Sequence, residues 1–224
     1  MTTAIILAAG KSTRMGGAVD KAFISIGGKP VLAWSLIAFE RSPEIDGIVL
    51  VVRKEQILAS GAVAKMFGIS KLQAVVPGGA KRPESVQAGL AACGSDTDRV
   101  VIHDAARPCI NSEIVSAVAK AVKRIPAVTV GRPVTDTVKR CGSGTSVVET
   151  VPREKLWTVQ TPQAFQFRVV RDALAAAKAS KIDVTDDCQA VESAGVPVKI
   201  IENLKPNPKI TTPDDVQMAS ALIK

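Results

Sequence analysis

Buried strands and helices alternate along the first 130 residues, and this pattern constrains the fold more than any other feature of the sequence. Short apolar runs predict strands at residues 4–8, 47–52, 72–76, 99–103 and 127–130. The longer stretches between them predict helices at residues 30–41, 55–67, 84–92 and 112–123. Strands that alternate with helices favour an α/β fold with a mostly parallel sheet and helices on both faces.

The alternation weakens after residue 130. Residues 134–139 and 146–151 read as two extended segments on either side of a Gly-Ser-Gly turn, which predicts a projecting hairpin. Further helices are predicted at 169–179, at 186–193 and from Thr212, and a strand at 198–201. We find no internal repeat or linker. We therefore expect a single domain, 1–224, that carries a β-arm at 134–153.

Charge and composition narrow the class of partner. The chain has 29 basic and 21 acidic residues, and its net charge of +8 favours anionic partners. Aromatic residues make up only 3%, and single-stranded nucleic-acid binders need aromatic stacking platforms, so we expect a small phosphorylated ligand and no nucleic acid. No apolar run reaches the length of a membrane span, so we expect no membrane partner. Four scattered cysteines favour reduced thiols and a cytoplasmic location.

The loop after the first strand, residues 7–17, is glycine-rich and begins Leu-Ala-Ala-Gly. Its small residues let backbone N–H groups approach phosphates, and Arg14 and Lys21 can neutralise negative charge. It is not a Walker A loop, because Ile5 stands where that motif needs glycine. A strand-linked GxGxxG is also missing, which argues against a dinucleotide-dependent oxidoreductase. An ordinary glycine-rich turn is the alternative.

An acidic turn, His-Asp-Ala-Ala-Arg-Pro at residues 103–108, follows the fourth strand. Asp104 can hold Mg²⁺, which prefers one or two carboxylates together with phosphate oxygens, and Arg107 can bind a second phosphate bidentately. The alternative is an Asp–Arg ion pair that only closes the turn. His103, the single histidine, has no catalytic partner at a recognisable spacing, and we expect it to be a packing residue.

At these motifs the sequence resembles the 2-C-methyl-D-erythritol 4-phosphate cytidylyltransferases of the non-mevalonate isoprenoid pathway. The resemblance extends over nearly the whole chain. It rests on the first loop with Lys21, the acidic turn, and Thr-Pro-Gln-Ala-Phe at 161–165. Further matching segments are Pro-Gly-Gly at 77–79 with Arg82 and Ser85, residues 133–139, Arg153 with Leu156-Trp157, residues 185–187, and 209–213.

The resemblance implies a Rossmann-like fold of the nucleotidyltransferase type and a homodimer joined through the arm. It implies CTP, a sugar-alcohol phosphate and Mg²⁺, with catalytic roles for Arg14, Lys21 and Lys209. The nucleotide-binding positions it implies are Ala8, Ala9, Gly10, Gly79, Ala80, Ser85 and Ala105. The positions facing the second substrate are Asp104, which is also the metal ligand, Arg107, Thr137, Thr161, Thr211, Lys209 and the partner's Arg153.

The sequence departs from the family pattern at three places. Asp20-Lys21-Ala22 stands where the family often has Pro-Lys-Gln. Ala80 replaces a commonly acidic residue, so any base contact there must come from the backbone, and Asn207-Pro208-Lys209 replaces a more usual Asn-Ile-Lys. Transfer to another acceptor such as ribitol 5-phosphate, a sugar-1-phosphate nucleotidyltransferase, and a non-catalytic nucleotide-binding module remain alternatives.

Overall fold

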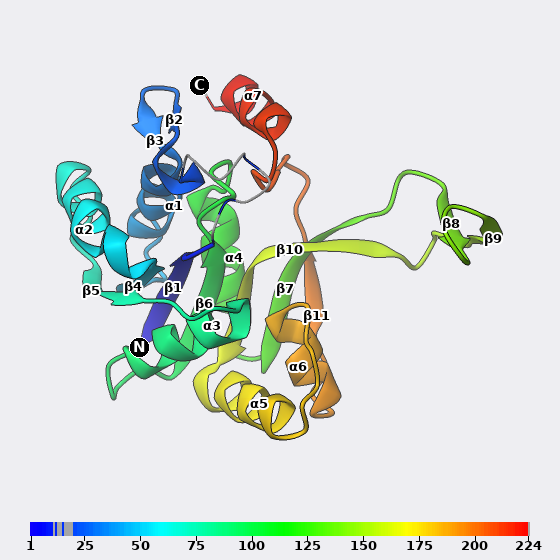
Figure 1. Ribbon diagram of the computed structural model, residues 1–224. Coiled ribbons are helices and arrows are strands. Elements are labelled where there is room, and N and C mark those ends of the chain that lie inside the picture. Colours follow the sequence, from blue (N-terminus) through cyan, green and yellow to red (C-terminus); the bar gives the residue numbers. More distant parts are fainter. Residues whose placement is uncertain (11, 13–14, 16–19, 224) are drawn as a thin grey trace.

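The computed structural model describes residues 1–10, 12, 15 and 20–223, and Arg14 lies outside these residues. In this part of the chain a seven-stranded sheet forms in the order β11-β7-β10-β6-β1-β4-β5 (Figure 1). Its strands are β1 (Thr2–Ala8), β4 (Gly47–Val52), β5 (Leu72–Pro77), β6 (Arg99–Asp104), β7 (Ala127–Pro133), β10 (Trp157–Gln166) and β11 (Lys199–Glu202). Only β10 runs antiparallel to its neighbours, so the predicted α/β fold is confirmed.

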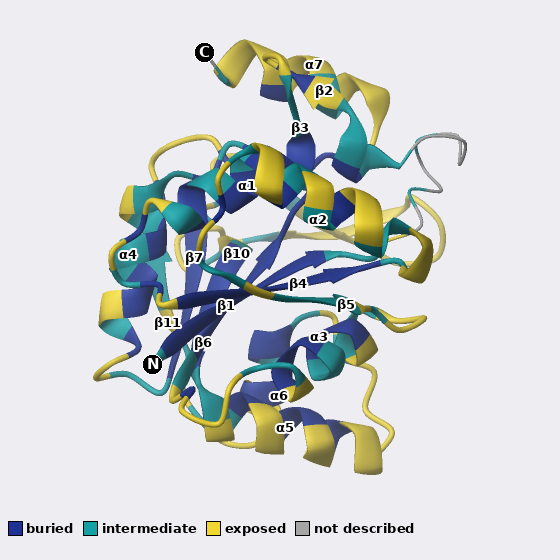
Figure 2. Ribbon diagram, turned by 90° about the vertical axis from the view of Figure 1, so that its left-hand side faces the viewer, coloured by how far each residue is buried: buried dark blue, intermediate teal, exposed yellow. Residues whose placement is uncertain are grey.

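Helices cover both faces of the sheet, as the alternation predicts (Figure 2). Side chains such as Ile6 and Leu50 pack on the face covered by α1, α2 and α4, whereas Ile5 and Val51 pack on the face covered by α3, α5 and α6. The helices are α1 (Val31–Glu40), α2 (Ile57–Met66), α3 (Arg82–Ala91), α4 (Ser112–Ala121), α5 (Phe167–Ala179), α6 (Asp187–Ser193) and α7 (Pro213–Leu222). Among the described residues, no helix combines the length and apolarity needed to cross a membrane.

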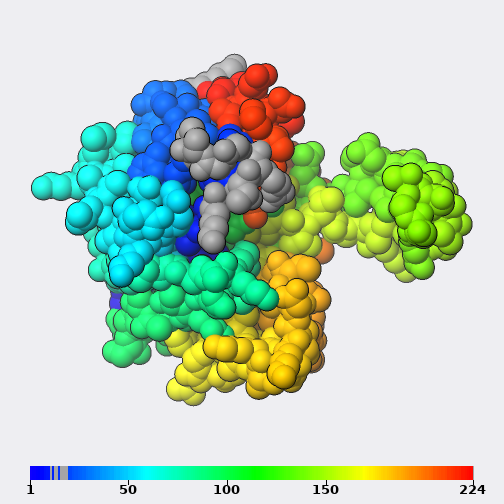
Figure 3. Space-filling model, in the orientation of Figure 1, coloured from blue at the N-terminus to red at the C-terminus, as the bar shows by residue number. Residues whose placement is uncertain are grey.

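The predicted arm is a hairpin of β8 (Val138–Cys141) and β9 (Val147–Val151). It continues outward from β7 and β10 and stands clear of the body of the molecule (Figures 1 and 3). Two neighbouring apolar side chains on β9, those of Val147 and Val148, are 58% and 67% exposed. The arm is therefore a projecting element with an apolar stretch at its outer end.

The pattern did not predict β10, which is ten residues long. Pro162 lies inside this strand, where the register shifts between Gln160 and Gln163. Proline cannot donate to a ladder and argues against a central strand in a sequence, but a bulge accommodates it here. The short strands β2 (Ser25–Ile26) and β3 (Lys29–Pro30) also escaped prediction, because two residues carry no period.

The C-terminal helix packs against an early part of the chain. Ile210 and Ala219 form a small buried cluster with Ile26 and Val31, so α7 lies on the β2–β3 hairpin (Figure 1). As predicted, Thr212 is the N-cap of α7 and Pro213 is its first residue. Asp215 completes a capping box with Thr212, and it also accepts hydrogen bonds from the N–H and hydroxyl of Thr211. The buried cluster fixes the segment between β11 and α7 beside the β2–β3 hairpin.

Candidate active site

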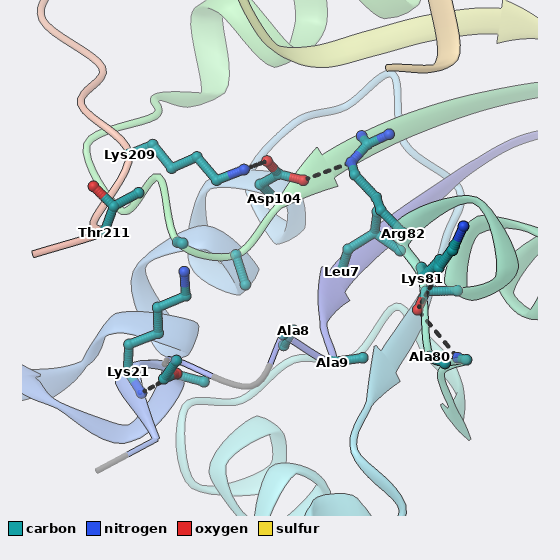
Figure 4. A pocket seen from close by; sticks show the side chains of 17 residues that line it. Leu7, Ala8, Ala9, Lys21, Ala80, Lys81, Arg82, Asp104, Lys209 and Thr211 are labelled. Carbon is teal, nitrogen blue, oxygen red and sulfur yellow. Dashed lines mark hydrogen bonds and ion pairs between the residues drawn. The ribbon is translucent and has the colours of Figure 1, made fainter. Parts of the chain in front are cut away.

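A cavity of about 290 Å³ opens at the carboxyl ends of β1 and β6 (Figure 4). Ligands of open α/β sheets bind at this edge, where loops follow the strands. Segments from four regions of the sequence line the cavity: the loop after β1, the turn after β5, the turn after β6, and the segment before α7. The predicted site residues among its lining are Ala8, Ala9, Gly10, Lys21, Gly79, Ala80, Ser85, Asp104, Ala105, Lys209 and Thr211.

Two lysines from opposite ends of the chain meet in this cavity. Lys21 lies on η2 (Lys21–Phe23), a single 3₁₀ turn, and its Nζ donates to the carbonyl oxygen of Ile210 at 3.1 Å. Lys209, the residue before Ile210, places its Nζ 2.6 Å from Oδ2 of Asp104. Figure 4 shows both side chains extending into the same cavity. The two cations therefore share one cavity.

Asp104 ends β6 and carries the negative charge of the cavity. Burial alone would raise the pKa of this carboxyl, but the charges of Arg82 and Lys209 outweigh burial and hold the pKa well below its usual range. The backbone N–H of Asp104 donates to Oγ1 of Thr161, which fixes the strand end from behind. Asp104 is thus an ionised, immobilised carboxylate facing the cavity.

Arg82 connects Asp104 to a second buried carboxylate, and the sequence did not predict a site role for Arg82. Its Nε lies 3.4 Å from Oδ1 of Asp104, and its Nη1 lies 2.8 Å from Oδ2 of Asp187. Burial raises the pKa of Asp187 to about 6, although the charge of Arg82 opposes this. The result is a row of alternating charges, Asp187, Arg82, Asp104 and Lys209. Sequence spacing does not predict this row, because Arg82 and Asp187 are far apart in the chain. Only the segments that resemble the family pointed to these two residues.

The turn after β5 is tightly packed against the loop after β1. A Cβ on Gly78 would lie 2.5 Å from Cβ of Ala9 and 2.7 Å from Oγ of Ser85, so only glycine fits there. The N–H of Gly79 donates to Oγ of Ser85, and the N–H of Ala80 donates to Oε2 of Glu84. These N–H groups already donate to side chains within the turn. A nucleotide base that binds there would therefore contact the remaining backbone carbonyl groups or displace the Ser85 and Glu84 side chains from these hydrogen bonds.

His103 lies beneath the site in the core. It is fully buried, its Nδ1 lies 3.1 Å from Oγ1 of Thr161, and its ring centroid is 5.2 Å from that of Phe39. Burial lowers the pKa of His103 to about 3, so the ring is neutral at physiological pH. The packing role expected for this histidine agrees with the structure.

Four predicted substrate-binding residues do not line the cavity. Thr161 lies behind Asp104, and Arg107 donates from Nη1 to the carbonyl oxygen of Asn207 at 2.7 Å. Thr137 and Arg153 are exposed in the arm region, where Arg153 donates to the carbonyl oxygen of Thr135. Their predicted roles stay predictions, as does that of Arg14.

Comparisons with known proteins agree with this geometry. The family model of IspD, 2-C-methyl-D-erythritol 4-phosphate cytidylyltransferase, matches residues 2–224. A protein of that name from Desulforamulus reducens is 42% identical over 222 residues, which cover 99% of this chain and 95% of the relative. One from Geobacter metallireducens is 39% identical over 225 residues, with coverage of 99% and 97%.

Solved structures of proteins from the same family also resemble this chain. The 4-diphosphocytidyl-2C-methyl-D-erythritol synthase from Anaerococcus prevotii superposes with a TM-score of 0.88 at 31% identity, covering 99% of this chain and 95% of that one. The 2-C-methyl-D-erythritol 4-phosphate cytidylyltransferase from Thermus thermophilus superposes with a TM-score of 0.79 at 30% identity, covering 97% and 96%. The family match spans the residues that build the cavity and the arm, and the chain belongs to the 2-C-methyl-D-erythritol 4-phosphate cytidylyltransferase family.

Proposed function

We propose that this chain transfers a cytidylyl group from CTP to 2-C-methyl-D-erythritol 4-phosphate and releases pyrophosphate. Family membership supports the reaction. The observation that carries the mechanism is the convergence of Lys21, Lys209 and Asp104 on one cavity at the carboxyl edge of the sheet. The product is the cytidine-diphosphate-linked methylerythritol intermediate of isoprenoid biosynthesis.

The reaction needs no strong general base. A phosphate oxygen of the acceptor, already an anion at pH 7, attacks the α-phosphorus of CTP. The new oxygen–phosphorus bond forms as the bond from the α-phosphorus to the bridging oxygen breaks, and pyrophosphate leaves with the electron pair. The main obstacles are repulsion between two anions and the charge that accumulates in the transition state. Fixed cations at Lys21 and Lys209 offset both.

We propose Asp104 as the carboxylate that holds Mg²⁺. The residue fits this role because it is ionised and faces the cavity, and because one or two carboxylates completed by phosphate oxygens are the ligands that Mg²⁺ prefers. Among the described residues no group of three or more metal-ligating side chains occurs, so the ion would be shared with the nucleotide. When bound, Mg²⁺ supplies positive charge to the triphosphate. Asp104 would hold the ion, and Lys209, whose Nζ lies 2.6 Å from Oδ2 of Asp104, would contact phosphate.

Pyrophosphate release measured with CTP and a panel of acceptors tests the reaction. Methylerythritol 4-phosphate is expected to be the preferred acceptor. A preference for ribitol 5-phosphate would assign the alternative acceptor, and a preference for a sugar 1-phosphate or for another nucleotide would assign the other class of nucleotidyltransferase. If no combination of nucleotide and acceptor releases pyrophosphate, the result would favour a non-catalytic nucleotide-binding module.

The lysines are tested by substitution. Lys21→Ala and Lys209→Ala are each expected to lower turnover by about 10²-fold or more, the usual cost of removing one preorganised electrostatic contact. Lys65→Ala is the matched control, because it removes the same charge from an exposed position on α2. Wild-type turnover in a folded Lys21→Ala chain would exclude Lys21 from the mechanism.

The metal role of Asp104 has a separate readout. A chelator is expected to stop turnover, and added Mg²⁺ to restore it. In Asp104→Asn, half-maximal turnover should require a higher Mg²⁺ concentration because the amide is a weaker ligand. A metal titration identical to that of the wild type would remove Asp104 as the ligand.

We also propose a homodimer that forms through the arm and acts in the cytoplasm. The arm supports dimerisation because Val147 and Val148 are exposed on an element that the body of the molecule does not cover. Arg153 and Thr137 would then contribute to the partner's acceptor site rather than to their own. Val148→Asp is expected to yield monomers in sedimentation analysis; a wild-type mass for a folded variant would refute the proposal.

The four free cysteines support the proposed cytoplasmic location, because thiols stay reduced in a reducing compartment.

A further inference from the structure

The turn that carries Lys21 is tied to the central sheet by an ion pair outside the cavity lining. We propose that Asp20 and Arg53 are positioning residues that hold Lys21 in the orientation needed for phosphate. The inference rests on the proposed role of Lys21 and extends it to two residues that the resemblance does not assign.

Asp20 uses both oxygens of its carboxylate. Oδ1 accepts a hydrogen bond from the backbone N–H of Ala22 at 3.1 Å, so Asp20 is the N-cap of η2. Oδ2 lies 2.7 Å from Nη2 of Arg53. The Asp20 side chain is only 8% exposed. One carboxylate therefore shapes the turn and also anchors it.

Arg53 provides a rigid anchor. It directly follows β4, an inner strand that pairs with β1 as far as Val52 opposite Ala8. The Arg53 side chain is 28% exposed, and its Nη1 also lies 3.2 Å from Oε1 of the more exposed Glu55. The ion pair thus connects the turn to the sheet edge that supports the cavity.

The turn needs this support because it is short. A three-residue 3₁₀ helix has poor hydrogen-bond geometry and little stability of its own. The buried Ala22 fixes one side of the turn, and Oγ of Ser12 accepts the Lys21 N–H at 3.2 Å. A small rotation of the backbone at Asp20 would be amplified along the lysine side chain and would move Nζ away from its position beside the Ile210 carbonyl.

Charge neutralisation gives the pair a second effect. Asp20 precedes Lys21, so an unpaired carboxylate there would repel an incoming triphosphate and attract the lysine ammonium. Arg53 neutralises that carboxylate at 2.7 Å. The pair therefore reduces the negative charge that Lys21 and an incoming triphosphate meet at residue 20.

Two variants break the pair from opposite sides. Asp20→Asn keeps an oxygen that can cap the Ala22 N–H but removes the charge that holds Arg53. Arg53→Met removes the guanidinium and keeps an apolar stem. Each is expected to lower kcat about tenfold, with a smaller change in KM for CTP, because misplacing a group that acts mainly in the transition state affects kcat. Glu55→Gln removes the other partner of Arg53 and is expected to keep wild-type kinetics.

The same substitutions in a Lys21→Ala chain separate positioning from general stability. If Asp20 and Arg53 act through Lys21, Asp20→Asn should change the residual turnover and the Kd for CTP less than twofold in that background. A tenfold loss in both backgrounds would overturn the proposal, as would wild-type kinetics in both single variants. Thermal unfolding of each variant shows whether a loss of turnover is caused by misfolding. If Asp20→Asn fails to fold, Arg53→Met provides the test. A Lys21→Ala chain with full activity would instead refute the role of Lys21 itself.

Discussion

Ionisation of Asp187 is expected to reduce the stability of the protein as the pH rises through weakly acidic values. This carboxyl is 1% exposed, and burial raises its pKa to about 6 even with Arg82 at 2.8 Å. In the unfolded chain the pKa returns to about 3.8. Between these values the folded protein holds a proton that the unfolded chain releases. The free energy of unfolding attributable to this group therefore falls as the pH rises from about 4 to about 6 and is constant above that.

The magnitude follows from the two pKa values. At 1.36 kcal/mol per pKa unit, a folded pKa of about 6 against 3.8 in the unfolded chain corresponds to roughly 3 kcal/mol. Asp187→Asn removes the ionisation and resembles the protonated acid in shape. Relative to the wild type, the variant should thus become more stable by about 3 kcal/mol between pH 4 and pH 7.

Urea unfolding of both chains at several pH values between 4 and 7.5 measures this difference. Carboxylates with lowered pKa values, such as Asp215 at about 2, lose stabilisation toward acid, but they do so in both chains and cancel. Arg82→Met should move the decline to higher pH, because it removes the charge that favours the ionised form. A difference between wild type and Asp187→Asn that is constant across this range would refute a raised pKa.

Four further outcomes test the packing of glycines and the burial of a cysteine. Gly89→Ala should lower the free energy of unfolding by about 1–3 kcal/mol, because the added Cβ would lie 2.4 Å from Cγ2 of Ile5. Gly61→Ala should raise the free energy of unfolding by up to about 1 kcal/mol, because the space around Gly61 is open. Urea unfolding measures both differences. Gly78→Ala should weaken CTP binding about tenfold by calorimetry, and an unchanged Kd would contradict the close packing of the turn. Cys188, which is buried and whose pKa burial raises far above its usual range, should be labelled by a thiol reagent only in denaturant, as mass spectrometry can show.

Sequence patterns predicted most of the fold because the apolar residues of each element mark the part of it that packs in the core. Short apolar runs located β1, β4, β5, β6 and β7, and the signals of Thr212 and Pro213 located the start of α7. Strand β10 escaped because Pro162 and the bulge beside it interrupt the pattern, and only the completed sheet supplies its two partners.

Parts of the site could be predicted for a different reason. Residues at the ends of strands, such as Asp104, lie at the carboxyl edge wherever parallel strands pair, so their convergence follows from topology. Contacts between distant segments do not follow from local pattern. Neither the Arg82–Asp187 pair nor the Asp20–Arg53 pair has a spacing that marks it in the sequence.

The packing of α7 on the β2–β3 hairpin has a consequence for synthesis on the ribosome. Lys21 and Lys209 are 188 positions apart, and the later one is held in place by Ile210 and Ala219 in their shared cluster. At about 5–20 residues per second, translation of that interval takes roughly 10–40 s. During this time the emerging polypeptide has the glycine-rich loop but not the second ammonium group. The enzyme therefore gains its full complement of cations only as the last helix leaves the exit tunnel.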